Sequence, residues 1–292
     1  IPWVNVCETI KARSMSKPLA LSDSQLDKLI LRREFLCGAA ALALAGCGSN
    51  IETTGWIGKV NELGGTVSST RRTLVDALIS GLKSNGVWTK LDRLWLFAAE
   101  NATSALVDLK AGAAATAVNS PSFSTNNGYT GNGSSSYIDS NYNPTTNATN
   151  FVQNSGCAFG WSNTAGADGG GLLGQSSVSI AIVPQYTDSN CYWGINTPAN
   201  ESTGGLGDGT GLWLANRSEA SAEQLYRNGS SVATGTVTSQ AVQNQNLFAL
   251  RVADIYSARQ CCCLGVGGSL NATEQGNLYN RLRTYMTAVG VP

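Results

Sequence analysis

Apolar residues recur at helical spacing in the segment that follows Gly64-Gly65. Ser68 or Ser69 can cap a helix there, whose apolar stripe is Leu74, Val75, Leu78, Ile79 and Leu82. After Asn85-Gly86 a second apolar face follows, at Val87, Trp88, Leu91, Leu94, Trp95 and Ala98. The short turn between them predicts a helical hairpin within residues 56–110. Two such helices bury little alone, so we expect their stripes to pack on a partner chain or on the domain that follows.

From about Ala117 the pattern changes to short alternating runs separated by Gly, Asn, Ser and Asp. Period-two alternation with frequent turns is typical of an antiparallel sandwich or jelly roll. We expect strands at residues 157–162, 171–175, 178–184, 191–196, 211–215, 222–227, 232–237, 247–252 and 261–266. Asn228-Gly229 predicts a tight hairpin, because both residue types tolerate positive φ.

The C-terminal segment carries the signals of a final helix. Asn271 and Glu274 have the spacing of a capping box, and Leu278, Leu282 and Met286 would line one face of the helix before Gly290 ends it. The pattern therefore predicts a mainly β chain, closed by one helix and preceded by two.

The first 55 residues carry a different pattern. Arg32-Arg33 and Phe35-Leu36 precede a small, apolar run over residues 37–45, and Leu44-Ala45-Gly46-Cys47 follows. These motifs resemble a twin-arginine export signal and a bacterial lipobox, which would make Cys47 the lipidated first residue of the mature chain. Alternatively, a helix capped by Ser22 or Asp23 runs to Ala45 and ends at Gly46 or Gly48. Both interpretations stay open.

Composition excludes several kinds of chemistry. The 292 residues contain 19 Lys and Arg, 19 Asp and Glu, and no histidine, so a Ser-His-Asp triad, a Cys-His pair and every histidine-containing metal site are excluded. Residues 111–216 contain no Lys or Arg. Nucleic-acid binding needs cations spaced along the phosphates, so we expect no nucleic-acid partner.

Several motifs carry a family resemblance. Residues 117–123 (AVNSPSF), leading into 128–139 (GYTGNGSSSYID), resemble the opening of a concanavalin A-like, laminin-G-like jelly roll of phage and prophage tail-associated proteins. Residues 225–229 (LYRNG) are similar to a hairpin common in that fold, and residues 267–274 (GGSLNATE) to its ending. Residues 88–94 (WTKLDRL) resemble the segment that precedes this domain in bacteriophage proteins.

The resemblance covers about residues 60–292 and implies an antiparallel jelly-roll β-sandwich over residues 111–292. It implies a virion component of the phage tail or capsid that recognises a glycan or cell-surface receptor. The helical hairpin would then contact other virion subunits or further copies of the chain. The alternative is an exported surface lipoprotein, periplasmic or membrane-anchored, with a carbohydrate-binding sandwich.

The fold that the resemblance implies also occurs in hydrolases and lyases, so the residues themselves decide whether catalysis is expected. The resemblance would imply Glu-x-Asp-x-x-Glu for a retaining glucanase, and that spacing does not occur. The nearest pair, Glu219 and Glu223, would share one face if its segment is a strand, although a solvated strand edge is the simpler interpretation. For a lyase, Tyr129, Tyr137, Tyr186 or Tyr192 would need Arg217, Arg227, Arg251 or Arg259 to approach. We therefore expect a non-enzyme, with a polysaccharide hydrolase or lyase as the alternative.

Metal and thiol chemistry have weak signals. Asp139, Asp168, Asp188 and Asp208 adjoin Gly, Ser or Asn and could offer Ca²⁺ ligands, but turn formation explains them more simply, so we expect no cofactor. Cys261-Cys262-Cys263 on a strand are expected to be small core residues. Cys157 and Cys191 could pair if the protein is exported.

A binding surface remains. Uncharged Asn, Ser, Thr, Gly and Tyr over residues 119–210 suit neutral hydroxylated ligands, which stack on aromatic faces and hydrogen-bond to amides. The candidate ligand-binding residues are Trp161, Tyr192, Trp193, Trp213, Tyr129 and Tyr137. On a regular strand Tyr192 and Trp193 face opposite ways, so at most one lines a given surface. A core position is the alternative for each.

Overall fold

The computed structural model describes residues 50–292. The expected export signal, the lipobox at Cys47 and the alternative helix ending at Ala45 all lie outside the described residues. None of the helices within residues 50–292 is long and apolar enough to cross a bilayer.

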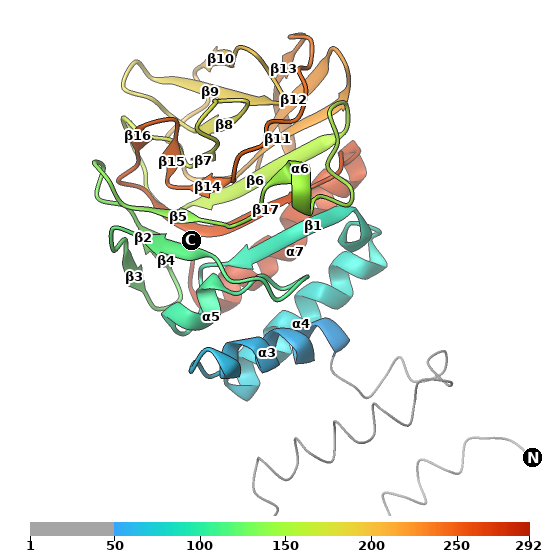
Figure 1. Cartoon of the computed structure of the whole chain (residues 1–292), viewed down its shortest axis with the longest axis vertical. Coiled ribbons are helices and arrows are strands. Elements are labelled where there is room, and N and C mark those ends of the chain that lie inside the picture. The colour runs from blue at the N-terminus through green and yellow to red at the C-terminus, as the bar shows by residue number, and fades with distance from the viewer. Residues whose placement is uncertain (1–49) are drawn as a thin grey trace, which may run out of the picture. The chain divides into compact units, whose positions relative to one another are not determined.

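Two antiparallel sheets form the body of the molecule (Figure 1). The first is 8-stranded, in the order β13-β12-β11-β6-β17-β4-β3, with β1 also paired to β17. Its strands are β1 (Leu91–Leu96), β3 (Ser122–Ser124), β4 (Gly128–Thr130), β6 (Gly156–Ser162), β11 (Gly211–Glu219), β12 (Ala222–Arg227), β13 (Ser230–Gly235) and β17 (Gln260–Gly267).

The second sheet is 7-stranded, in the order β10-β9-β8-β7-β14-β5-β2. Its strands are β2 (Thr116–Val118), β5 (Tyr137–Asp139), β7 (Leu173–Gly174), β8 (Ile180–Val183), β9 (Asn190–Ile195), β10 (Glu201–Gly204) and β14 (Phe248–Ala249). Alternation decides which side chains enter the core between the sheets: Ile180 and Ile182 lie inside it, whereas Ala181 and Val183 face outward. The expected mainly β antiparallel sandwich with a C-terminal helix is confirmed.

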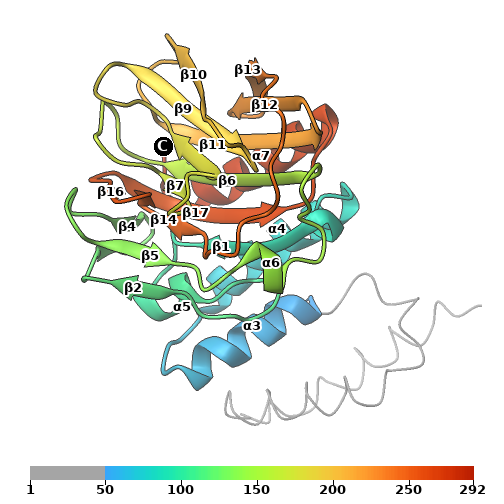
Figure 2. The same cartoon turned by 45° about the horizontal axis from the view of Figure 1, so that its top comes forward.

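Helices cover the outer face of the first sheet (Figure 2). They are α3 (Ile51–Glu62), α4 (Ser69–Ser84) and α7 (Ala272–Val289), whereas α5 (Ala102–Leu106) and α6 (Pro144–Asn147) are short turns of helix between strands. Val75 and Leu82 of α4 share one apolar cluster with Leu278 of α7 and Phe159 of β6. The α4 stripe therefore packs on the domain that follows it, which was one of the two expected outcomes.

The expected second helix over residues 87–98 is wrong. A single 3₁₀ turn, Trp88–Lys90, leads directly into β1. Leu94 packs on the helix side of the sheet, and Trp95 packs in the core between the sheets. Because β1 is buried on both faces, its consecutive residues Leu94, Trp95 and Leu96 are all large and apolar, so the sequence shows no period-two alternation and also fits a helical pattern.

Local signals explain the remaining elements. Asn228 and Gly229 have φ of 51° and 78°, as the predicted hairpin requires. The capping box of Asn271 and Glu274 is present, and Gly290 ends α7 in the left-handed conformation. The expected strand over residues 247–252 breaks at Leu250, whose φ is 66°. From there β15 (Arg251–Val252) and β16 (Ile255–Tyr256) form a separate hairpin.

Candidate functional site

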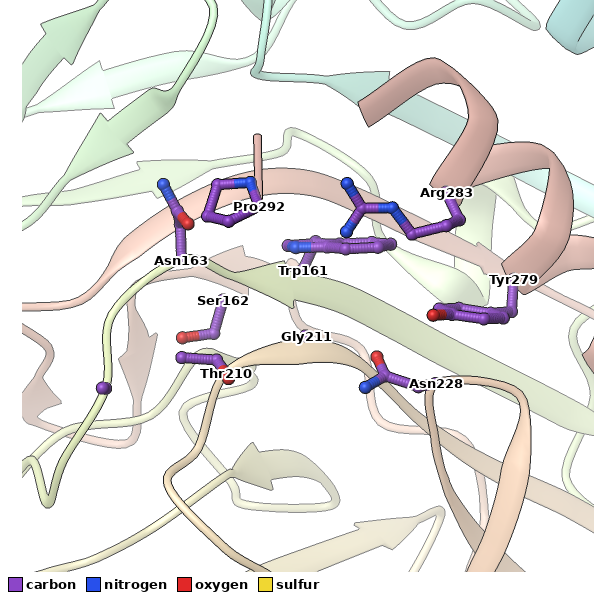
Figure 3. A pocket seen from close by; sticks show the side chains of 10 residues that line it. Trp161, Ser162, Asn163, Thr210, Gly211, Asn228, Tyr279, Arg283 and Pro292 are labelled. Carbon is purple, nitrogen blue, oxygen red and sulfur yellow. The ribbon is translucent and has the colours of Figure 1, made fainter. Parts of the chain in front are cut away.

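A pocket of about 300 Å³ opens where the first sheet meets the C-terminal end of the chain (Figure 3). It lies between the end of β6, the start of β11, the β12–β13 turn and α7. Its lining residues are Trp161, Ser162, Asn163, Ala165, Thr210, Gly211, Asn228, Tyr279, Arg283 and Pro292.

An aromatic pair forms one wall of the pocket. Trp161 and Tyr279 have ring centroids 6.1 Å apart and planes inclined by 10°. The guanidinium carbon of Arg283 lies 4.9 Å from the Trp161 ring centroid. Tyr279 and Arg283 are four residues apart on α7 and therefore share one face of the helix. Trp161 is only 1% exposed, whereas Tyr279 is half-buried and its hydroxyl points toward the pocket (Figure 3).

Neutral polar groups form the opposite wall. Asn228 lies in the β12–β13 turn, where its Oδ1 accepts the Leu212 N–H at 2.9 Å. Gly211 has a φ of 94°, and a Cβ there would lie 2.3 Å from Asn228 Oδ1, so only glycine fits beneath this amide. Thr210 contributes a hydroxyl beside it. The lining residues include no Asp or Glu, and Arg283 has the one charged side chain among them.

A buried arginine fixes the loop at the pocket's edge. Arg259 is fully buried and donates hydrogen bonds to the carbonyls of Thr164 at 2.7 Å, Gly166 at 2.6 Å and Gln185 at 3.1 Å. Asn163 is held by the same region, because its Nδ2 donates to Gln260 Oε1 at 2.9 Å. The loop after β6 is therefore positioned by hydrogen bonds to β17 and its flank.

The structure brings one of the six predicted ligand-binding residues, Trp161, to this pocket. Trp193, Trp213 and Tyr129 belong to the core between the sheets. As expected, Tyr192 faces away from Trp193, and its hydroxyl donates to Asp188 at 2.6 Å on the outer side of the second sheet.

Tyr137, the last of the six, packs with Phe248 and Arg251, also away from the pocket. Sequence reasoning missed Asn228, Tyr279 and Arg283 as site residues, because their segments were interpreted as a turn and a packing helix. The available signal was the Tyr-Arg pair at spacing four, on the helix face adjacent to that of Leu278 and Leu282.

The condition under which Glu219 and Glu223 would share one strand face is not met, because a hairpin turn separates them and places them on β11 and β12. Glu219 is exposed. Glu223 is buried against Arg217, so it is no solvated edge residue either. Burial raises the pKa of the Glu223 carboxyl, and the Ile195 N–H and the Arg217 guanidinium oppose that rise.

The four aspartates that were considered as Ca²⁺ ligands each accept local hydrogen bonds. The Asp188 carboxylate accepts a hydrogen bond from the Tyr192 hydroxyl, which lowers the pKa of Asp188. A hydrogen bond from the Thr210 hydroxyl lowers the pKa of Asp208 in the same way. Asp139 accepts from Asn141 N–H at 2.8 Å, and Asp168 accepts from Ala258 N–H at 3.1 Å. Within residues 50–292 no three acidic or cysteine side chains gather as metal ligands.

All described cysteines are buried thiols, which confirms the core interpretation of Cys261, Cys262 and Cys263. Cys157 lies in the helix-side core and Cys191 in the core between the sheets, so these two form no disulfide. Burial raises the pKa of the Cys191 and Cys261 thiols to about 12, so both stay protonated at neutral pH.

Comparisons with known proteins place the fold. No protein-family model matches the chain, and no curated protein matches it. The sialidase of Trypanosoma rangeli matches with a TM-score of 0.50 at 11% identity, over 74% of this chain and 40% of the sialidase. The same sialidase in complex with sialic acid gives a TM-score of 0.48 at 11% identity, over 68% of this chain and 34% of that one. The chain therefore spans well under two thirds of these sialidase chains.

Another similar structure is domain 4 of AbnA, an extracellular GH43 arabinanase from Geobacillus stearothermophilus, in complex with arabinotriose. Its TM-score is 0.44 at 15% identity, over 65% of this chain and 98% of that domain. At these identities the comparisons establish the β-sandwich fold alone.

The comparisons correct one expectation and leave another without support. The expectation of a non-enzyme is corrected as follows: a sialidase chain carries a similar β-sandwich, so the fold by itself does not point away from an enzyme. Nothing in them supports an origin in a phage or prophage tail, so the virion context stays a prediction.

Proposed function

We propose that residues 50–292 form a carbohydrate-binding β-sandwich whose saccharide site is the pocket beside α7. The observation that carries this proposal is the lining, in which the aromatic pair Trp161 and Tyr279 faces the neutral groups of Asn228 and Thr210. Sugars present apolar C–H faces, which pack on aromatic rings, and hydroxyls, which pair with amides and hydroxyls.

The size of the pocket agrees with this ligand class. Its volume of about 300 Å³ lies at the lower end of the range for small-molecule sites, about 300–1,000 Å³, and suits about one or two sugar units. A glycan array probed with the full chain tests the proposal. Binding of a saccharide supports it, and an array with no bound saccharide would overturn it. Hydrolysis is measured on the same glycans, because the fold is shared with sialidases.

Tyr279→Ala is expected to weaken binding of the array-selected saccharide about ten-fold, because one aromatic face and one hydroxyl are lost from the wall. Isothermal titration measures the change, with thermal unfolding recorded for each variant. Tyr186→Ala is the matched control, since Tyr186 is also half-buried but packs on Tyr192 away from the pocket. Equal affinity of the Tyr279 variant and the unmodified protein would place the saccharide elsewhere.

For cellular context we propose attachment to a bacterial membrane, which the Leu44-Ala45-Gly46-Cys47 motif favours. Expressed from its natural gene in its host, the protein is expected in the membrane fraction as a chain that begins with a lipid-modified Cys47. Mass spectrometry of that fraction measures the mass of the N-terminal peptide. Recovery of an unmodified chain that retains residues 15–46 would end this proposal.

A further inference from the structure

We propose that the pocket selects saccharides that carry a carboxylate, and that Arg283 is the specificity-determining residue that binds this group. The inference rests on the proposed function and assigns the chemical class of its ligand. It starts from an imbalance of charge around α7.

Arg283 has no carboxylate partner among the described residues. Five other arginines each lie within 4.0 Å of one: Arg93 with Asp108, Arg217 with Glu223, Arg227 with Asp208, Arg251 with Asp254 and Arg259 with Asp168. The acid next to the pocket in sequence, Asp208, is already engaged by Arg227 and Thr210. The pocket therefore presents a cation that no neighbouring side chain neutralises.

The guanidinium of Arg283 is fixed in position. Its Nε donates to Thr287 Oγ1 at 3.0 Å, its Nη2 donates to the Val291 carbonyl, and its plane lies near the Trp161 ring. These contacts use two of the five N–H donors of an arginine, so about three remain, including both on Nη1. Figure 3 shows the guanidinium above the Trp161 ring, at the border of the pocket.

A guanidinium held in this way matches a planar carboxylate, to which it can donate two parallel hydrogen bonds. Burial of the Trp161 ring and the absence of lining acids strengthen this attraction, because no acidic side chain of the lining competes for the guanidinium. The Nδ2 amino group of Asn228 and the hydroxyl of Tyr279 are left for the hydroxyls of the same sugar. A uronic acid or another sugar acid combines both kinds of group.

The test compares sugars with and without a carboxylate. One pair is the methyl glycosides of glucuronic acid and glucose, and a second pair is those of galacturonic acid and galactose. Any carboxylated array hit is also compared with its methyl ester. For at least one pair, the unmodified protein is expected to bind the carboxylated member about ten-fold more tightly than the neutral one. Arg283→Gln is expected to reduce this ratio to about one while the affinity for the neutral member stays unchanged. Arg283→Lys keeps the positive charge but cannot donate two parallel hydrogen bonds from one planar group. Its affinity ratio is expected to lie between those of the unmodified protein and Arg283→Gln.

Arg281→Gln is the matched control. Arg281 lies two residues earlier on α7 and likewise has no carboxylate partner among the described residues, but it donates to Asn85 Oδ1 at 2.9 Å and does not line the pocket. Its variant is expected to keep the ten-fold ratio.

Equal binding of neutral and carboxylated sugars by the unmodified protein would overturn this inference and leave the proposed function standing. A preference that survives Arg283→Gln would equally overturn the role of Arg283. An array without any bound saccharide would overturn the proposed function, and this inference with it.

Discussion

Arg217→Met is expected to lower the free energy of unfolding by about 3–5 kcal/mol, because it leaves the buried carboxylate of Glu223 without its cation. The two residues are directly opposite each other on β11 and β12, and both side chains are fully buried. Arg217 also donates from Nε to the Ile195 carbonyl at 2.6 Å and from Nη2 to the Val237 carbonyl at 3.0 Å. The guanidinium thus connects β9 of the second sheet to the first sheet.

The loss should depend on pH. Burial already raises the pKa of Glu223, and removal of the guanidinium raises it further. A carboxyl whose pKa is raised in the folded state contributes stability below its unfolded pKa and loses it as pH rises through the folded pKa. The deficit of the Arg217 variant should therefore be smaller at about pH 4 than at about pH 8, and urea unfolding at the two pH values measures it.

A second substitution separates the missing charge from the missing side chain. Arg217→Met combined with Glu223→Leu removes both charges and is expected to recover part of the lost stability, since an apolar pair can replace a buried ion pair. Lys59→Met breaks the exposed pair with Glu62 and should change stability far less. If the double variant is no more stable than Arg217→Met alone, the unpaired carboxylate is not the cause.

The charge pattern along the chain did not predict the buried pair of Arg217 and Glu223, or the other arginines that enter the sandwich. Residues 111–216 contain no cation, and from this run the sequence predicted only that no nucleic acid binds there. In space, arginines from later in the chain enter that region: Arg259 holds the loop after β6, and Arg251 lies 4.8 Å from the Tyr137 ring centroid. A run of residues without Lys or Arg can therefore still have cations beside it in the fold, because antiparallel pairing brings distant segments together.

The fold was more predictable than the site. Alternation, turn residues and the capping box locate the strands and the last helix, because each is a local property of the chain. The pocket depends on residues from four segments, represented by Trp161, Thr210, Asn228 and Tyr279. Their meeting follows from the packing of α7 on the first sheet, and no local pattern encodes it. Only Trp161 carried a signal of its own, as a large aromatic in a polar region.

The second large effect is expected at Asp92, in the segment whose strand was mistaken for a helix. Its carboxylate is buried and accepts the backbone N–H groups of Asn150 at 2.8 Å and Phe151 at 3.0 Å, and the Tyr142 hydroxyl at 2.8 Å. It also accepts the Thr149 N–H at 3.2 Å. One side chain of β1 thus satisfies the turn that leads from α6 toward β6.

Asp92→Ala is expected to cost about 3 kcal/mol or more, because several buried donors lose their acceptor together and each unsatisfied donor costs about 1–3 kcal/mol. Urea unfolding measures the loss, and hydrogen exchange locates it, with faster exchange expected at the amides of Asn150 and Phe151. Asp92→Asn keeps the shape of the side chain but replaces one acceptor by a donor. Its free energy of unfolding should therefore lie between those of the unmodified protein and Asp92→Ala. Asp188→Ala, which removes an exposed turn carboxylate, should cost far less, because water replaces its hydrogen bonds. Unchanged protection of Asn150 and Phe151 in Asp92→Ala would contradict this role, since it would mean that these amides are held by something other than the β1 carboxylate.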